Sequence, residues 1–333
     1  MTKPTGAGRD WKARCTSEEF KDLWDQTRGS AAEIARILKT SERAIHARRR
    51  SIENREGRPL LSRQPNSPDY PSLAPEFPDW QTLEIKNGLL VCISDGHFVP
   101  HIKSTAHRAA LKLIAELKPK AIIDMGDMAD FASISRHHRI GWDKQLPVRE
   151  EISWWRDCMD EFREAGGKGC KTLKCQSNHE QRFSGHLSNA ANAMAYEGVR
   201  GFSLSDHLEG WPLSWAVRVN DDQLEVTHRW KSAIHAPWLN TMNAGISYAT
   251  GHLHSQKIYP LTDLRGDRWG VDVGTLSTIY GPHFRYMEAK PRSWRSGFAV
   301  FRFVDYKLRQ PQLVRVVDEK KGIVEYLDRD IAA

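Results

Sequence analysis

The sequence feature that most restricts the possible fold is a series of Asp, His and Asn residues. Most of them follow an apolar segment with the pattern of a β-strand. The apolar segments are residues 89–94, 121–125, 172–176 and 224–227. The polar residues that follow them, or lie in a later Gly-His-Leu-His sequence, are Asp95, His97, Asp127, Asp130, Asn178, His179, His228, His252 and His254. Because an α/β sheet exposes its functional edge at the carboxyl ends of its strands, we expect these side chains to gather at one edge.

Carboxylate, imidazole and carboxamide groups form a donor set that suits Mn, Fe, Zn or Ni better than Ca or a thiolate-bound metal. Two such ions about 3.5–4 Å apart can share a bridging carboxylate and hold a bridging hydroxide for in-line attack on phosphorus. A single Asp or His at the end of a strand is more often a helix cap or a surface group. The prediction of a dinuclear metal site therefore depends on the ordered set.

The order and composition of five short motifs resemble the calcineurin-like metallophosphoesterase superfamily, over about residues 85–305. The motifs are DGH (95–97), GDMAD (126–130), SNHE (177–180), the His at position 228 and GHLH (251–254). The stretch GDMADFASISRHHR also resembles phage-borne members that are often described as DNA-repair exonuclease-like. The resemblance implies an α/β fold in which two mixed β-sheets pack together and are flanked by helices.

The resemblance also implies a role for each motif residue. The first metal ligands would be Asp95, His97 and His254, and Asp127 would bridge both metals. The second site would be completed by Asn178, His228 and His252. His179 would lie beside the phosphate and assist the leaving group, either as a general acid or by hydrogen bonding. The expected cofactors are two divalent metal ions, with Mn favoured and Fe, Zn or Ni as alternatives.

Some positions depart from the family pattern or have a second interpretation. Ser177 stands where the family has the Gly of its GNH motif, and Arg229 replaces a common Gly and could crowd or charge the phosphate pocket. His235 lies seven residues after His228 and is a rival ligand. Asp130 could orient a metal-binding histidine or cap the next helix.

A run of basic residues follows the second motif at Arg136, His137, His138 and Arg139. These side chains could contact substrate phosphates, although a charge run is often only a solvated face.

Strand and helix patterns alternate over residues 82–333, which predicts one α/β domain. An Asn-Gly pair at positions 87 and 88 predicts a hairpin that joins residues 83–86 to 89–94. A helix is predicted to begin after Pro147 and end at Gly166. Residues 213–219 are predicted to form one continuous strand.

Residues 1–57 predict a separate helical module, joined to the α/β domain by a linker with six prolines within residues 58–81. The segment 31–50 resembles a helix-turn-helix of the resolvase or phage-regulator kind, and a small helical bundle for protein contacts is the alternative. Residues 1–64 carry 15 Lys and Arg against 9 Asp and Glu, which favours a polyanionic partner. The expected contacts to nucleic acid are Arg43, His46, Arg48, Arg49 and Arg50.

Five scattered cysteines and the lack of a signal-like apolar segment predict reduced thiols, no membrane partner and a cytoplasmic location, in a bacterial or phage-infected cell. The whole sequence predicts a metal-dependent phosphoesterase that cleaves phosphodiester bonds in nucleic acid, with DNA favoured as the partner. One alternative is a phosphomonoesterase acting on a phosphoprotein or small molecule. The other is a DNA-binding protein in which this fold is catalytically idle.

Overall fold

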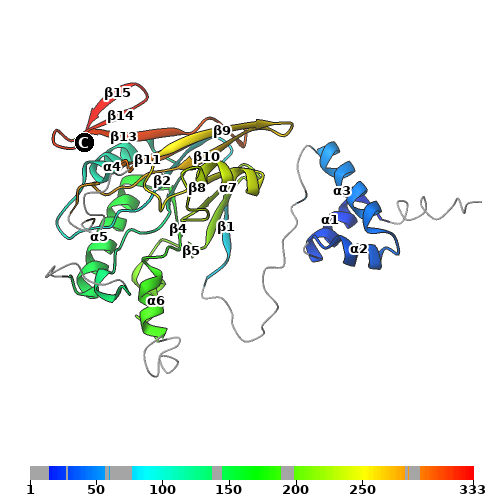
Figure 1. Ribbon diagram of the computed structural model, residues 1–333, viewed down its shortest axis with the longest axis horizontal. Coiled ribbons are helices and arrows are strands. Elements are labelled where there is room, and N and C mark those ends of the chain that lie inside the picture. Colours follow the sequence, from blue (N-terminus) through cyan, green and yellow to red (C-terminus); the bar gives the residue numbers. More distant parts are fainter. Residues whose placement is uncertain are drawn as a thin grey trace, which may run out of the picture. The chain divides into compact units, whose positions relative to one another are not determined.

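The computed structural model describes residues 15–27, 29–56, 60, 77–136, 145–188, 199–281, 284 and 293–333. The chain divides into two compact units, residues 1–75 and 76–333 (Figure 1). Most of the predicted linker, together with His137, His138 and Arg139, lies outside the described residues. Within the described ranges, no helix has both the length and the apolar character needed to cross a membrane.

The N-terminal unit contains three helices within the segment that the sequence predicts to be helical. They are α1 (Ser17–Gln26), α2 (Ala31–Ile37) and α3 (Glu42–Glu56). Thr16 and Glu19 form a reciprocal capping box at the start of α1, and Ser30 caps α2. Their apolar faces meet in a small core of Cys15, Phe20, Trp24, Ala31, Ile34, Ala35, Ile45 and Ile52. The DNA-binding role of these helices stays a prediction.

Two arginines of α3 pack on the core of their own unit. The Arg48 guanidinium lies 5.7 Å from the ring centre of Phe20, and that of Arg49 lies 5.5 Å from the ring of Trp24. Arg43 and Arg50 are exposed, whereas His46, like Arg48 and Arg49, is half-buried. Phosphate contacts by α3 would therefore fall first on Arg43 and Arg50.

The C-terminal unit is built on two mixed β-sheets. The first, sheet A, has the strand order β1 (Trp80–Leu83), β6 (Ala216–Val219), β7 (Leu224–Thr227), β8 (Ser247–Thr250), β10 (Gly266–Asp272) and β9 (Lys257–Asp263). The second, sheet B, has the order β15 (Arg329–Ala332), β14 (Ile323–Tyr326), β13 (Gln312–Asp318), β11 (Gly297–Val304), β2 (Gly88–Ile93), β3 (Ala121–Asp124), β4 (Lys171–Cys175) and β5 (Leu213–Ser214), while β12 (Lys307–Leu308) pairs with β11. The expectation of two mixed sheets is confirmed.

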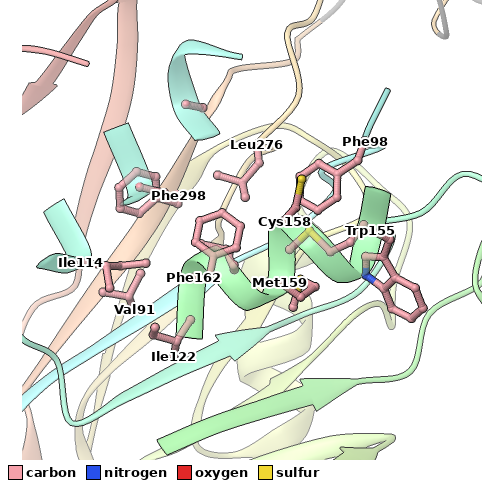
Figure 2. Close-up of a cluster of buried hydrophobic side chains, with 14 of the residues drawn as sticks. Val91, Phe98, Ile114, Ile122, Trp155, Cys158, Met159, Phe162, Leu276 and Phe298 are labelled. Carbon is pink, nitrogen blue, oxygen red and sulfur yellow. The ribbon is translucent and has the colours of Figure 1, made fainter. Parts of the chain in front are cut away.

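Alternating side chains of β2 place it between two hydrophobic cores. Leu90 and Cys92 point into the core between the two sheets, whereas Val91 and Ile93 join the core that the helices cover. Figure 2 shows this second core, in which Val91 and Ile122 lie near Phe162 of a long helix. Sheet B is therefore a buried central layer, with sheet A on one face and helices on the other.

The helices of this unit are α4 (Thr105–Leu117), α5 (Val148–Gly166), α6 (Gln181–Ser188) and α7 (Ala236–Ala244), with short 3₁₀ turns η1 (Ala132–Ile134) and η3 (Leu204–His207). Helices α4 and α5 cover sheet B, while α7 packs against β8, β9 and β10 of sheet A. As predicted, α5 begins after Pro147 and ends at Gly166, followed by Gly167 with φ 70°. The flanking helices complete the expected architecture.

Two sequence predictions about strands are wrong. The Asn87-Gly88 turn does not close a hairpin, because β1 pairs in parallel with β6 in sheet A while β2 lies in sheet B. The predicted strand over residues 213–219 is divided between the sheets, with β5 beside β4 and β6 beside β1 and β7. In both cases the chain crosses from one sheet to the other, and a local apolar pattern does not record which sheet a strand joins.

Candidate metal centre

Parallel strands from both sheets direct their carboxyl ends toward one site. In sheet B, β2 pairs with β3 and β3 with β4 in parallel, and in sheet A, β7 pairs with β8 in parallel. The residues that follow these five strands include Asp95, His97, Asp127, Asn178, His179, His228, His252 and His254. The structure therefore brings the sequence-predicted residues together from five separate loops.

The first cluster joins Asp95, His97 and His254. Oδ1 of Asp95 lies 2.9 Å from Nε2 of His254 and 4.0 Å from Nε2 of His97, and the two Nε2 atoms are 3.4 Å apart. All three side chains are at most 6% exposed. One metal ion can reach a ligand atom of each residue.

The second cluster joins Asp127, His228 and His252, with Asn178 beside them. Nε2 of His228 lies 3.1 Å from Oδ2 of Asp127 and 2.9 Å from Oδ1 of Asn178. The rings of His228 and His252 are 5.2 Å apart. The four residues predicted for the second metal therefore lie side by side.

The arrangement of hydrogen-bond donors and acceptors in the second cluster fits a bound cation. Nδ1 of His228 lies 3.0 Å from the carbonyl oxygen of Met125, so Nδ1 carries the donating proton. In the neutral ring, Nε2 then carries a lone pair that faces the oxygens of Asp127 and Asn178. Three acceptors that face one another need a proton or a metal ion between them. The donor set and its orientation therefore fit a divalent metal.

The electrostatics of the two buried aspartates depend on the surrounding histidines. Burial raises the pKa of a carboxyl group, but the charge and hydrogen bond of His254 lower the pKa of Asp95 to about 2. Burial also disfavours the charged form of His228, yet Asp127 raises its pKa to about 9. His252, in contrast, has a pKa lowered to about 4 by burial and by the charge of His228. A protonated His228 thus balances Asp127 when no cation is bound.

Asp130 links the two histidines nearest to it. Its Oδ1 lies 2.6 Å from Nδ1 of His179 and 3.3 Å from Nδ1 of His97. The side chain therefore orients imidazoles, which is one of the two roles that the sequence left open. Nε2 of His179 faces the second cluster, 3.8 Å from Oδ2 of Asp127.

Backbone conformation sets the ligand loops apart from the rest of the sheet edge. Five candidate ligands have left-handed backbones, with φ values of 55° for Asp95, 39° for His97, 54° for Asp127, 68° for His252 and 55° for His254. Each such residue costs roughly 1–2 kcal/mol compared with the right-handed conformation. Backbone strain concentrated at converging side chains is typical of a functional site.

Ser177 supports the loop that carries Asp127. Its hydroxyl accepts a hydrogen bond from the backbone N–H of Asp127 at 2.9 Å. A Cβ atom on Gly126, whose φ is 103°, would lie 2.4 Å from Cβ of Ser177. The serine at this position therefore holds the neighbouring loop, and the glycine before Asp127 gives it room.

A buried charge cluster lies under the same loops and was missed by sequence reasoning. Lys174, which is 1% exposed, places Nζ 2.5 Å from Oδ2 of Asp124 and 2.8 Å from Oε1 of Glu180. The two carboxylates accept backbone hydrogen bonds from Gly126 and Met128. A lysine between the apolar residues Leu173 and Cys175 was the signal available in the sequence.

Arg182 is a second residue that the sequence analysis missed. Its Nη2 lies 3.1 Å from Nε2 of His179, and its Nη1 donates to the carbonyl oxygen of Asp130 at 2.6 Å. Its position three residues after His179, at the start of α6, was the only sequence signal. A cation therefore contacts the candidate catalytic histidine.

The remaining predicted residues lie around or away from the centre. Arg229 is exposed, and its charge contributes to the lowered pKa of His252. His235 is exposed beside Tyr259, with ring centres 6.4 Å apart, and belongs to none of the metal-ligand groups found among the described residues. Arg136 is exposed.

Comparisons with known proteins give only a distant likeness. No protein-family model matches the sequence, and no curated protein matches it. Similar solved structures include Vps29 from Entamoeba histolytica complexed with Zn²⁺, with a TM-score of 0.40 and 11% identity, covering 73% of this chain and 98% of that one. Another is Vps29 from Chaetomium thermophilum, with a TM-score of 0.38 and 8% identity, covering 73% of this chain and 97% of that one. These values assign this chain neither a ligand nor an activity.

Proposed function

We propose that this chain is a dinuclear metal-dependent phosphoesterase that hydrolyses phosphodiester bonds in nucleic acid. The observation that carries the proposal is the junction of two buried Asp and His clusters at the ends of five strands, with Asp95 and His254 in one and Asp127 and His228 in the other. Asn178 adds a neutral oxygen beside His228. Two divalent ions held there would supply a hydroxide nucleophile near neutral pH and offset the charge of the phosphate.

The residues around the clusters suit the other requirements of phosphate ester cleavage. His179 can hold a proton at Nε2 for the leaving oxygen, because Asp130 accepts from its Nδ1, and the charge of Asp127 and the hydrogen bond to Asp130 raise the pKa of the ring. In the present arrangement Nε2 accepts from Arg182 instead. Proton donation by His179 therefore requires the guanidinium to move to another acceptor, and a phosphate oxygen is a matching one.

A nucleic-acid substrate is supported by charge distribution. The basic excess lies in the N-terminal unit, where Arg43 and Arg50 are exposed on α3. A basic unit on the same chain would raise the local concentration of nucleic acid at the metal centre. DNA is the favoured partner.

The test combines metal binding with hydrolysis. We expect the full chain to bind two Mn²⁺ ions per molecule in calorimetry and to hydrolyse a chromogenic phosphodiester in Mn²⁺. Asp127→Asn removes the charge of the carboxylate proposed to bridge the metals, so it should weaken metal binding and lower hydrolysis at least a hundredfold. Mn²⁺ is tested first, then Fe²⁺, Zn²⁺ and Ni²⁺.

Other outcomes assign other functions. Hydrolysis of a chromogenic monoester alone would replace the diesterase with a phosphomonoesterase. Binding of two metals and of duplex DNA with no hydrolysis of any ester would leave a non-catalytic DNA-binding protein. Failure to bind any divalent metal would refute the metal centre itself.

A further inference from the structure

An exposed tryptophan follows one candidate ligand of the second metal site closely in the sequence. Residues 228–231 read His-Arg-Trp-Lys, and Trp230 is 43% exposed although it follows a buried candidate ligand by only two residues. Two residues of extended chain span about 7 Å. The backbone of Trp230 therefore lies within about 7 Å of the backbone of the candidate ligand His228.

Trp230 is held by a rigid neighbour. Its ring centre lies 5.2 Å from that of Tyr248, which is 5% exposed in the central strand β8. The Tyr248 hydroxyl accepts a hydrogen bond from Oγ1 of Thr227 at 3.3 Å. An aromatic ring that packs against a buried ring and is still 43% exposed is a platform on which another flat ring can stack.

Cations flank this platform. Lys231 is exposed and places its Nζ 5.6 Å from the centre of the Trp230 ring. Arg229, the residue before Trp230 in the sequence, is also exposed. Residues 226–262 contain no Asp or Glu, and Glu225, the acidic residue that reaches Tyr248, is paired with Arg218. The surroundings of Trp230 therefore favour a polyanion.

We propose that Arg229, Trp230 and Lys231 bind an unpaired nucleotide of a single-stranded nucleic acid next to the metal centre. This inference rests on the proposed function and specifies that the nucleic-acid substrate is single-stranded. The base stacks on Trp230, and the flanking phosphates contact Arg229 and Lys231. In a duplex the face of each base is covered by its stacked neighbours, so this platform selects single strands or frayed ends.

The test separates base stacking from charge. Binding of a fluorescent 12-nucleotide oligothymidylate to the full chain is compared with an abasic strand of equal length, in buffer with EDTA so that no metal is bound and nothing is cleaved. We expect tighter binding of oligothymidylate than of the abasic strand. Trp230→Ala should weaken oligothymidylate binding about tenfold and leave the abasic strand unchanged. An oligouridylate arm distinguishes RNA from DNA as the source of the base.

Three variants serve as controls. Trp230→Phe should restore most of the preference for bases, because it keeps an aromatic face. Trp215→Ala removes another exposed tryptophan, 44% accessible beside Phe77, and should bind as the wild type does. The double variant Arg229→Gln/Lys231→Gln should weaken both strands equally and reduce the salt dependence of binding by about 0.7 per residue.

Two outcomes would overturn the proposal. The first is a Trp230→Ala variant that still prefers oligothymidylate over the abasic strand. The second is self-association of the wild type that Trp230→Ala abolishes, which would assign this surface to a second copy of the chain. Neither outcome depends on Mn²⁺-dependent hydrolysis of a small diester by the wild type, so the two proposals can fail separately.

Discussion

Oδ1 of Asp130 lies 2.6 Å from Nδ1 of His179, and the same oxygen lies 3.3 Å from Nδ1 of His97. One carboxylate therefore positions both the candidate catalytic histidine and a candidate metal ligand. Asp130→Asn keeps the shape of the side chain but removes its charge. We expect metal affinity and kcat each to fall about 10- to 100-fold, which calorimetry and hydrolysis assays would measure.

The control for Asp130 is Asp157→Asn, on an exposed position of α5. If Asp130 acts through His179, adding Asp130→Asn to His179→Ala should lower kcat much less than it does in the wild type. Fully additive losses would argue against the coupling.

His228 and His235 offer a direct choice between rival ligands. His228 is buried against Asp127, whereas His235 is exposed beside Tyr259. We expect His228→Ala to weaken one of two Mn²⁺ sites at least a hundredfold in calorimetry, and His235→Ala to change neither site more than twofold. The reverse result would transfer the ligand role to His235.

Lys174 balances two buried carboxylates, so its removal should destabilise the fold. Lys174→Met leaves Asp124 and Glu180 without their cation, and breaking such a buried network costs about 3–5 kcal/mol. Urea denaturation of the full chain measures this loss. Lys171→Met, at an exposed position of the same strand, is the matched control and should change stability by less than about 0.5 kcal/mol. Equal effects of the two substitutions would contradict the structural role of Lys174.

Glu151 makes the stability of the domain depend on pH. Oε2 of Glu151 accepts a hydrogen bond from the backbone N–H of Phe131 at 2.5 Å, and burial raises its pKa from 4.5 to about 7. The folded state thus holds the proton more tightly than the unfolded state. The stabilisation is present below pH 4.5 and is lost as pH rises toward 7.

Glu151→Gln should remove this component, because the amide stays neutral and still accepts from Phe131. Between pH 5 and 8 the wild type should lose on the order of 3 kcal/mol more unfolding free energy than the variant. Glu150→Gln, at an exposed position, should follow the wild-type curve. Parallel curves for the wild type and Glu151→Gln would show that Glu151 does not titrate in this range.

Local patterns in the sequence were enough to locate the site but not to assign every strand to a sheet. Asp95, Asp127 and Asn178 follow parallel strands of one sheet, so a strand-end rule places them together. His228 and His252 follow strands of the other sheet, and only the packing of the two sheets brings them near. The family resemblance supplied that step.

The errors have a common cause. The supposed hairpin at Asn87 and the supposed single strand over residues 213–219 both lie where the chain passes between sheets. An Asn-Gly pair indicates a turn, and an apolar run indicates a buried strand, but neither identifies the strand with which that segment pairs. Lys174 and Arg182 were missed because a lone cation in a sequence is usually an exposed surface residue, and one partner of each, Asp124 and Asp130 respectively, comes from a distant segment.

The left-handed backbone at five candidate ligands also limits which replacements these loops tolerate. Asp, Asn and His are the residues besides glycine that adopt this conformation most readily, while β-branched side chains rarely do. The residue types that bind the proposed metals are therefore the ones that the backbone itself favours. Replacing Asp95, Asp127 or His254 with Asn should keep the loop shape while changing the ligand, whereas Val or Ile would alter both. A loss of function caused by a β-branched replacement there would therefore reflect the changed backbone as much as the lost metal ligand.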